Sequence, residues 1–262
     1  MKNITNYFLL IILVISLIIL KPTSQSNIFK FNYLLNNIIY LDLENDDEDI
    51  NDPCRPRNLE QLKGKKLIAF TFDDGPNNKT TLKLLEGLEK YDARVTFFVL
   101  GSRVNNNKES LVKAYETCNQ IGNHTYNHFN LLKQNTTTIT NEINTTNLEV
   151  YNIVGEYPTI IRPPYGNTNS NIKNIGNMPT ILWNIDTLDW KYRNKDRISN
   201  EIIEKAHDGA IVLLHDIYST SIEGALIAME ELKDEYVFVT IEEMMLLKNI
   251  EIDKNKTYYN FK

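Results

Sequence analysis

The sequence has few of the residues that most metal and redox sites use, with only four histidines and two cysteines among 262 residues. Two cysteines cannot supply a four-thiolate metal site, and they are too few for a small domain held together by disulfides. If the chain is exported, Cys54 and Cys118 could pair with each other, and two separate thiols are the other interpretation. The positions of the four histidines therefore become the main question.

The chain also lacks an excess of positive charge. Its formal net charge is −6 at pH 7, whereas a protein that grips nucleic acid phosphates usually carries a basic domain. We therefore expect no nucleic acid partner. Hydrophobic residues make up 42% of the chain and charged residues 24%, which excludes an intrinsically disordered chain and a polytopic membrane protein.

A run without charge extends from Tyr7 to Leu20. As a helix it would rise about 21 Å, less than the roughly 30 Å of a membrane's hydrocarbon core. Because Lys2 precedes the run and small polar residues follow it, residues 1–26 are typical of a signal peptide, with a membrane anchor as the alternative. Both interpretations place the rest of the chain outside the cell, secreted or at the cell surface. Residues 27–64 include an acidic run and are predicted to be a linker.

From about residue 65, short apolar runs alternate with helical patterns. Strands are predicted at 67–72, 95–100, 159–161, 181–185, 211–214 and 237–241, and helices at 81–91, 108–118, 138–154, 195–206 and 221–235. Near-continuous apolar strands that alternate with helices indicate an α/β fold with a parallel sheet. About seven such units favour a barrel-like closure over an open sheet.

Residues that can carry chemistry follow these apolar runs directly. Asp73 and Asp74 follow the first run, and His124 and His128 lie just after Ile121. Later runs are followed by Arg162, Asp186 and His215. Each piece alone has an ordinary explanation, such as a turn at Asp-Gly-Pro. In barrels of this kind, however, active sites lie at the carboxyl ends of the strands, so we expect these side chains to meet.

The residue types in this set favour a metal-dependent hydrolase. Two imidazoles and one carboxylate supply three ligands to a divalent metal and leave a position open, which is typical of catalytic zinc. Of two adjacent aspartates, one can bind the metal while the other stays free as a base. A histidine from a distant strand end can then act as the acid.

Five segments, taken in order, resemble the motifs of the polysaccharide deacetylase family, carbohydrate esterase family four. They are TFDDG at 71–75, HTYNH at 124–128, RPPY at 162–165, DTLDW at 186–190 and LLH at 213–215. The resemblance implies an α/β fold, a distorted (β/α) barrel of about seven parallel strands in a single catalytic domain. We expect this domain at 65–248 and a C-terminal tail at 249–262.

The resemblance also implies a role for each motif residue. Asp74, His124 and His128 would hold a divalent metal, usually zinc in this family. Asp73 would be the general base and His215 the general acid.

Further motif residues would set the state of the base and the acid. Arg162 would orient Asp73 and lower its pKa. Asp186 would fix the tautomer and the charge of His215.

The last three motif residues would contact the substrate. The backbone N–H of Tyr165 would help to hold the negatively charged oxygen, and Trp190 and Leu213 would line a pocket for the acetyl methyl group. The expected activity is hydrolysis of N-acetyl groups on N-acetylglucosamine residues of an extracellular polysaccharide, either peptidoglycan or chitin. The alternatives are an O-acetyl esterase acting on a xylan-type polysaccharide and a catalytically silent wall-binding protein. The protein is expected to be a monomer.

Overall fold

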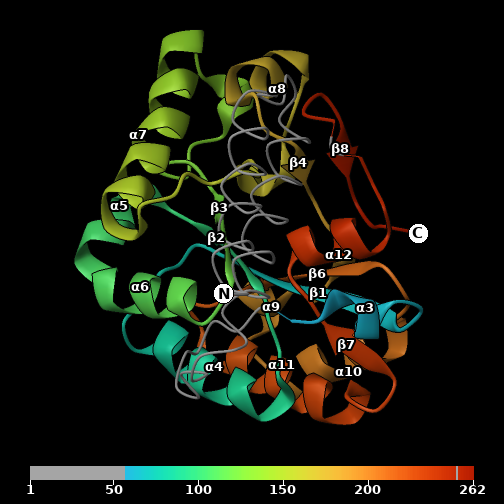
Figure 1. Ribbon diagram of the computed structural model, residues 1–262. Helices are drawn as coiled ribbons and strands as arrows, with labels where there is room; N and C mark the ends of the chain where they lie inside the picture. Colours follow the sequence, from blue (N-terminus) through green and yellow to red (C-terminus); the bar gives the residue numbers. More distant parts are fainter. Residues whose placement is uncertain (1–56, 252) are drawn as a thin grey trace, which may run out of the picture. The chain divides into compact units, whose positions relative to one another are not determined.

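The computed structural model describes residues 57–251 and 253–262 (Figure 1). The predicted signal peptide or anchor at 1–26 and the predicted linker as far as residue 56 lie outside these residues, as does Cys54. Among the described residues, no helix combines the length and the apolar character needed to cross a membrane.

Strand β1 (Lys66–Asp73) lies at the centre of the sheet, and every residue after Lys66 in it is buried. On one side it pairs with β6 (Ala210–His215). On the other side its first residues pair with β7 (Tyr236–Phe238) and its last residues with β2 (Thr96–Val99), which pairs in turn with β3 (Gln120–Asn123). All of these pairs are parallel, so the carboxyl ends of the strands lie along one edge.

Short strands continue the sheet towards closure. β4 (Thr180–Ile181) pairs with β8 (Thr257–Tyr258), and β5 (Ile185–Asp186) pairs with β6, both in parallel. Parallel bridges at Ile161 join the end of β3 to β4. The strands thus form an interrupted ring, which confirms the predicted α/β fold with a distorted barrel of parallel strands.

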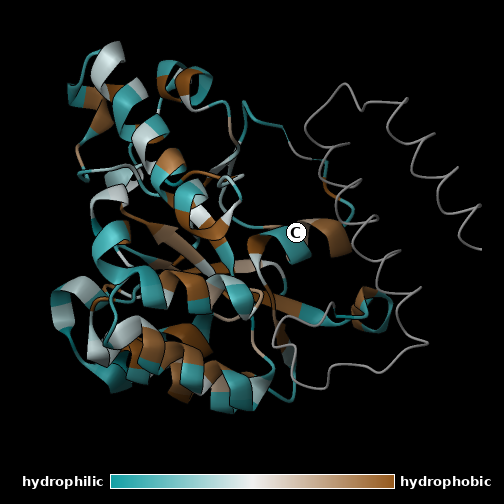
Figure 2. Cartoon of the chain, turned by 60° about the vertical axis from the view of Figure 1, so that its left-hand side comes forward, coloured by the Kyte–Doolittle hydropathy of each residue, from teal (hydrophilic) through white to brown (hydrophobic). Residues whose placement is uncertain are grey.

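Helices cover the strands, and their apolar faces supply much of the core. They are α3 (Leu59–Leu62), α4 (Thr80–Leu88), α5 (Gly101–Val104), α6 (Lys108–Glu116), α7 (Thr136–Val154), α8 (Ser170–Gly176), α9 (Asp189–Tyr192), α10 (Lys195–Lys205), α11 (Ser219–Leu232) and α12 (Ile241–Leu247). Asn135 caps α7 and Asn194 caps α10 by accepting from a backbone N–H in the first turn. In Figure 2 the central strands are largely brown, whereas the helices carry teal and brown residues together, as expected for helices with one buried face.

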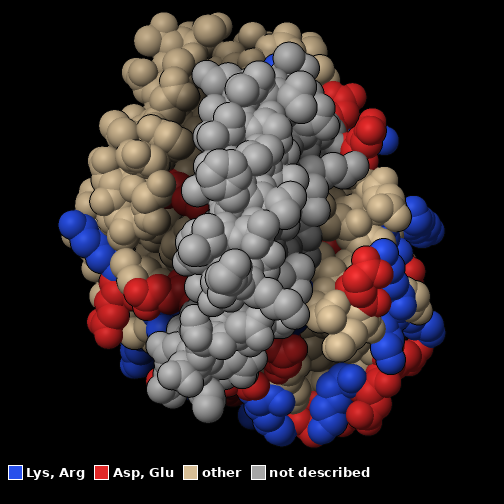
Figure 3. Space-filling view, viewed as in Figure 1, with Lys and Arg blue, Asp and Glu red and all other residues tan. Residues whose placement is uncertain are grey.

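The surface charge is uneven in the view of Figure 3. Lys, Arg, Asp and Glu gather over the lower part of the molecule, where Figure 1 shows α10 and α11. Helices α7 and α8 lie in the upper part of the same view, where most side chains are uncharged. This agrees with the Asn- and Thr-rich sequence of α7 and with the single charged residue, Lys173, of α8.

The folded region extends past both of its predicted boundaries. Before residue 65, Arg57 donates from Nη1 to the carbonyl oxygen of Phe238 at 2.8 Å. Residues 249–262, predicted to be a tail, instead contribute β8 and the buried ring of Phe261. Gly209 makes this packing possible, since a Cβ there would lie 1.9 Å from the Phe261 carbonyl oxygen. These few residues have no periodic pattern, and so the apolar alternation did not reveal them.

Cys118, which follows α6, is disulfide-bonded, and no cysteine among the described residues is free. The other cysteine of the predicted pair, Cys54, lies outside the described residues.

Candidate metal centre and active site

The side chains predicted at the strand ends meet at the carboxyl edge of the sheet. Asp73 is the last residue of β1 and stands opposite His215, the last residue of β6, in the parallel register. His124 follows β3 directly, and Arg162 follows the bridge at Ile161. Because parallel strands end on the same edge, residues far apart in the chain become neighbours.

Asp74, His124 and His128 form a group that could hold a metal ion, with one ligand atom from each within 4.8 Å of the others. Oδ1 of Asp74 lies 3.6 Å from Nε2 of His124 and 3.5 Å from Nε2 of His128. This buried oxygen has no hydrogen-bond partner within the described ranges. A buried carboxylate oxygen that faces two imidazole nitrogens fits a cation, and this donor set is typical of catalytic zinc.

His124 is held in the tautomer that metal binding needs. Its Nδ1 lies 2.6 Å from the carbonyl oxygen of Arg162. Because a carbonyl oxygen can only accept, Nδ1 carries the proton and Nε2 presents a lone pair towards Asp74. Burial lowers the pKa of His124 to about 3, so the ring is neutral at pH 7, the form that binds a metal.

The loop between the two histidines is fixed by Glu142 of α7. This buried carboxylate accepts from the backbone N–H groups of Tyr126 at 3.0 Å and Asn127 at 2.7 Å, and from Nδ2 of Asn127 at 2.7 Å. Thr125 and His128 have positive φ values of 68° and 61°, a backbone path that needs support. Glu142 is not among the residues predicted from the sequence, where its one signal is a carboxylate on the buried face of a predicted helix.

Arg162 is fully buried and every part of its guanidinium has a partner. Its Nη1 donates to Oδ1 of Asp73 at 2.7 Å and to Oγ1 of Thr71 at 2.8 Å. Nε and Nη2 donate to the carbonyl oxygens of Ile181 and Leu182, each at 3.0 Å. Arg162 therefore holds Asp73 in one orientation.

The pKa of Asp73 is raised, because burial raises it more than Arg162 and His215 lower it. The expected lowering by Arg162 is thus real, but it is the smaller of two opposing effects. A raised pKa makes an aspartate a better proton acceptor than one exposed to water, provided that it stays ionised.

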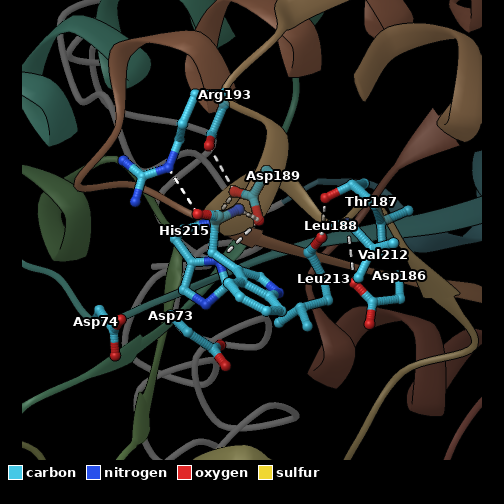
Figure 4. A network of polar contacts seen from close by, with 12 residues as sticks. Asp73, Asp74, Asp186, Thr187, Leu188, Asp189, Arg193, Val212, Leu213 and His215 are labelled. Atoms are coloured by element: carbon cyan, nitrogen blue, oxygen red, sulfur yellow. Dashed lines mark hydrogen bonds and ion pairs between the residues drawn. The ribbon is translucent and has the colours of Figure 1, made fainter. Parts of the chain in front are cut away.

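The partner of His215 differs from the predicted one. Nδ1 of His215 lies 2.9 Å from Oδ1 of Asp189 (Figure 4). Asp186 accepts instead from the backbone N–H of Leu188 at 2.9 Å, and Figure 4 shows it apart from the imidazole. Leu188 has a φ of 51°, and this left-handed turn brings Asp189 rather than Asp186 to the ring. The structure therefore corrects the predicted partner from Asp186 to Asp189.

Asp189 is fully buried and accepts several hydrogen bonds. Its donors, besides the imidazole, are the backbone N–H groups of His215 and Trp190, each at 2.8 Å, and Oγ of Ser221 at 2.5 Å. Burial alone would lower the pKa of His215, but Asp189 with Asp73 and Asp74 raises it to about 9. With this pKa, His215 carries a proton at neutral pH that it could donate.

The three predicted substrate residues lie in different environments. Tyr165 is 63% exposed, has a φ of 64° and packs edge-on against His128 with ring centroids 4.8 Å apart. Trp190, in α9, is 50% exposed, whereas Leu213 is buried within β6. Two aromatic side chains near the site are thus open to solvent.

Comparison with known proteins supports the same identification. A family model described as polysaccharide deacetylase matches residues 60–178. The peptidoglycan-N-acetylglucosamine deacetylase PgdA of Listeria monocytogenes is 40% identical over 185 residues, which are 70% of this chain and 40% of PgdA. The chain thus spans less than half of the length of that relative.

Solved structures match over most of their length. Peptidoglycan deacetylase PdaC from Bacillus subtilis superimposes with a TM-score of 0.70 at 40% identity, covering 71% of this chain and 93% of that one. A family 4 acetyl xylan esterase from Clostridium thermocellum, in complex with a cobalt ion, gives a TM-score of 0.71 at 30% identity and covers 74% and 98%. The fold, the five motifs and these matches together show that the chain belongs to the polysaccharide deacetylase family.

Proposed function

We propose that this protein removes N-acetyl groups from N-acetylglucosamine residues of an extracellular polysaccharide and releases acetate, with peptidoglycan as the leading substrate and chitin as the other candidate. One observation carries the proposal. Asp73, which a buried arginine holds, and His215, which is protonated, lie on either side of a group of three potential metal ligands. The names of PgdA and PdaC support peptidoglycan as the polymer.

The metal would be held by Asp74, His124 and His128, and we propose zinc. When bound, a divalent cation polarises the acetyl carbonyl and makes a nearby water more acidic. Two features of the site support this proposal. His124 is neutral, so its Nε2 can bind a cation, and Oδ1 of Asp74 accepts no hydrogen bond from the described residues.

Asp73 would take the proton from the attacking water. Its Oδ1 is occupied by Arg162, whereas its Oδ2 lies 3.6 Å from Nε2 of His124, on the side of the metal ligands. Oδ2, which faces the metal ligands, is therefore the oxygen that could accept the proton of the water. The hydrogen bond from Arg162 to Oδ1 prevents the carboxylate from rotating.

His215 would protonate the departing sugar nitrogen, because an amine leaves an amide carbon only with difficulty unless it gains a proton. Asp189 holds Nδ1–H, so Nε2 is the nitrogen that would deliver the proton. The backbone N–H of Tyr165 would help to stabilise the oxyanion, and Trp190 and Leu213 would receive the acetyl methyl group.

We further propose that residues 1–26 export the chain, either as a cleaved signal peptide or as an anchor, and that residues 27–56 serve as a linker. The catalytic domain would act as a monomer at the cell surface or outside the cell.

Acetate release tests the proposal directly. The purified protein is incubated with peptidoglycan, glycol chitin and acetylxylan, with and without a metal chelator. We expect release from at least one of the first two, loss on chelation and recovery with zinc. Asp73→Asn and His215→Ala should each lower release about a hundredfold or more, whereas the control Asp196→Asn, on the exposed face of α10, should not.

The same assay evaluates the alternatives. Release from acetylxylan alone would favour the O-acetyl esterase, which the similarity to the acetyl xylan esterase supports. Zinc binding without acetate from any polymer would favour a silent wall-binding protein. Undiminished release in the presence of chelator would contradict the metal mechanism.

A further inference from the structure

We infer that Arg193, seated on Tyr218 beside Trp190, forms a subsite for a carboxylate carried by the sugar next to the one that reacts. The inference rests on the proposed function and narrows its substrate class to an acidic glycan. Three observations carry it: how Arg193 is held, what its guanidinium lacks, and where it lies relative to His215.

Arg193 is held firmly although it is exposed. Its backbone N–H donates to the carbonyl oxygen of Asp189 at 3.1 Å, and its Nε donates to the carbonyl oxygen of Trp190 at 2.8 Å. Its guanidinium carbon lies 3.1 Å from the centroid of the Tyr218 ring. A long side chain fixed by one hydrogen bond and one ring face has already lost most of its rotamer freedom, so a ligand would not have to order it.

The guanidinium has unused binding capacity. Within the described part of the chain, no carboxylate forms an ion pair with Arg193, whereas the nearby Lys195 pairs with Glu223 at 3.5 Å. With Nε occupied, the two Nη groups still offer four N–H donors. The planar guanidinium can donate to both oxygens of a carboxylate at once. An uncharged hydroxyl or acetamido group does not offer this pair of charged acceptors.

The subsite adjoins the proposed acid. The Tyr218 ring that carries Arg193 lies with its centroid 6.0 Å from that of His215, and the Tyr218 N–H donates to the His215 carbonyl oxygen at 3.4 Å. Asp189 connects the imidazole to Arg193. Its side chain accepts from Nδ1 of His215, and its backbone carbonyl oxygen accepts from the backbone N–H of Arg193 (Figure 4). The Tyr218 ring alone therefore separates the guanidinium of Arg193 from the imidazole of His215. A carboxylate on the adjoining sugar could reach the guanidinium while the acetamide lies at His215.

Trp190 completes the surface. Trp190 has an exposed ring and belongs to the short helix α9, which ends one residue before Arg193. An indole face can stack on the apolar face of a sugar ring, so the tryptophan and the arginine would contact different groups of one acidic disaccharide. Chitin and xylan backbones lack the carboxylate, whereas muramic acid and its attached peptide supply one.

The test compares kcat/KM on three substrates of similar length: chitohexaose, peptide-free peptidoglycan strands with the lactyl carboxylate, and strands that retain their peptides. Wild type should prefer one of the carboxylate-bearing substrates, and the preference should weaken as salt rises. Arg193→Gln should reduce the preference about tenfold or more, with Arg193→Lys in between. The matched control is Arg197→Gln, whose guanidinium rests on the Tyr192 ring instead.

The strand substrate whose kcat/KM falls more in Arg193→Gln identifies the carboxylate that binds. A larger fall on peptide-free strands indicates the lactyl carboxylate, and a larger fall on peptide-bearing strands indicates a peptide carboxylate. A wild type without preference for either, or an Arg193→Gln variant with the full preference, overturns the inference. If no substrate releases acetate, the proposed function has failed, and calorimetric binding of the peptide-free and peptide-bearing strands reads the subsite alone. Weaker binding by Arg193→Gln than by Arg197→Gln then supports the subsite, and equal binding overturns it.

Discussion

The protonation of the proposed acid, His215, depends on a single side chain that the sequence did not predict, Asp189. We expect Asp189→Asn to lower kcat about a hundredfold or more, because an amide cannot both accept from Nδ1–H and balance the imidazolium charge. NMR titration of the metal-free protein should show the pKa of His215 falling from about 9 towards its ordinary value.

The matched control is Asp186→Asn, which keeps the oxygen that accepts from the Leu188 N–H. It should change kcat by no more than a few-fold. If Asp186→Asn lowered kcat strongly and Asp189→Asn did not, Asp186 would be the partner of His215, as the sequence predicts. The assignment of Asp189 as that partner would then be wrong. Sequence alone could not choose between these aspartates, since both follow the same strand and only the left-handed backbone at Leu188 separates them.

At the scale of elements, helix α7 supports the candidate metal centre through Glu142. We expect Glu142→Gln to weaken zinc binding about tenfold, because the amide turns N–H groups towards the N–H donors that the carboxylate now satisfies. Competition with a chromophoric chelator measures this affinity without any need for turnover. The control Glu149→Gln lies on the same helix and contacts Asn105 instead. Equal zinc affinity in both variants would contradict a role for Glu142.

The C-terminal segment is a second element whose importance can be measured. Phe261 is 1% exposed and its backbone N–H donates to the Gly209 carbonyl oxygen at 2.9 Å. Truncating its buried ring in Phe261→Ala should reduce the free energy of unfolding by about 3–5 kcal/mol in urea titrations. Tyr259→Ala, which removes a ring that is 53% exposed, should stay within about 0.5 kcal/mol. Similar losses in both variants would show that the segment does not act through its buried ring.

Elements with a strong period could be predicted, and short ones could not. The run at 67–72 became β1 (Lys66–Asp73) and the pattern at 138–154 became α7 (Thr136–Val154), within two residues at each end. Strand β3 (Gln120–Asn123) carries one large apolar side chain and is absent from the predicted strands, although all four of its residues are buried. Its strand character comes from pairing with β2, which a local pattern does not contain.

For the whole molecule, parallel topology explains why so much of the site followed from the sequence. Once strands alternate with helices, the residues after each strand must share one edge, so Asp73 and His215 could be placed together without coordinates. What could not be predicted depends on backbone paths within loops and on packing between elements, as for Asp189, Glu142 and Phe261.

The candidate site should also couple the stability of the whole metal-free protein to pH. The folded pKa of His215 is about 9, above its ordinary value of 6.5. A group with a raised folded pKa stabilises the fold fully below its unfolded pKa, and this contribution is lost as the pH rises through the folded value. Between pH 7 and 9 the free energy of unfolding should therefore fall, with about 2 kcal/mol of the loss due to His215. Half-buried Glu242, whose pKa is raised to about 8 by desolvation and by the neighbouring carboxylates of Glu243 and Glu156, acts in the same direction. The difference between wild type and His215→Gln, each unfolded in urea with chelator across this range, isolates the histidine. Parallel curves for the two proteins would show that Asp189 does not raise the pKa of His215 in the folded state.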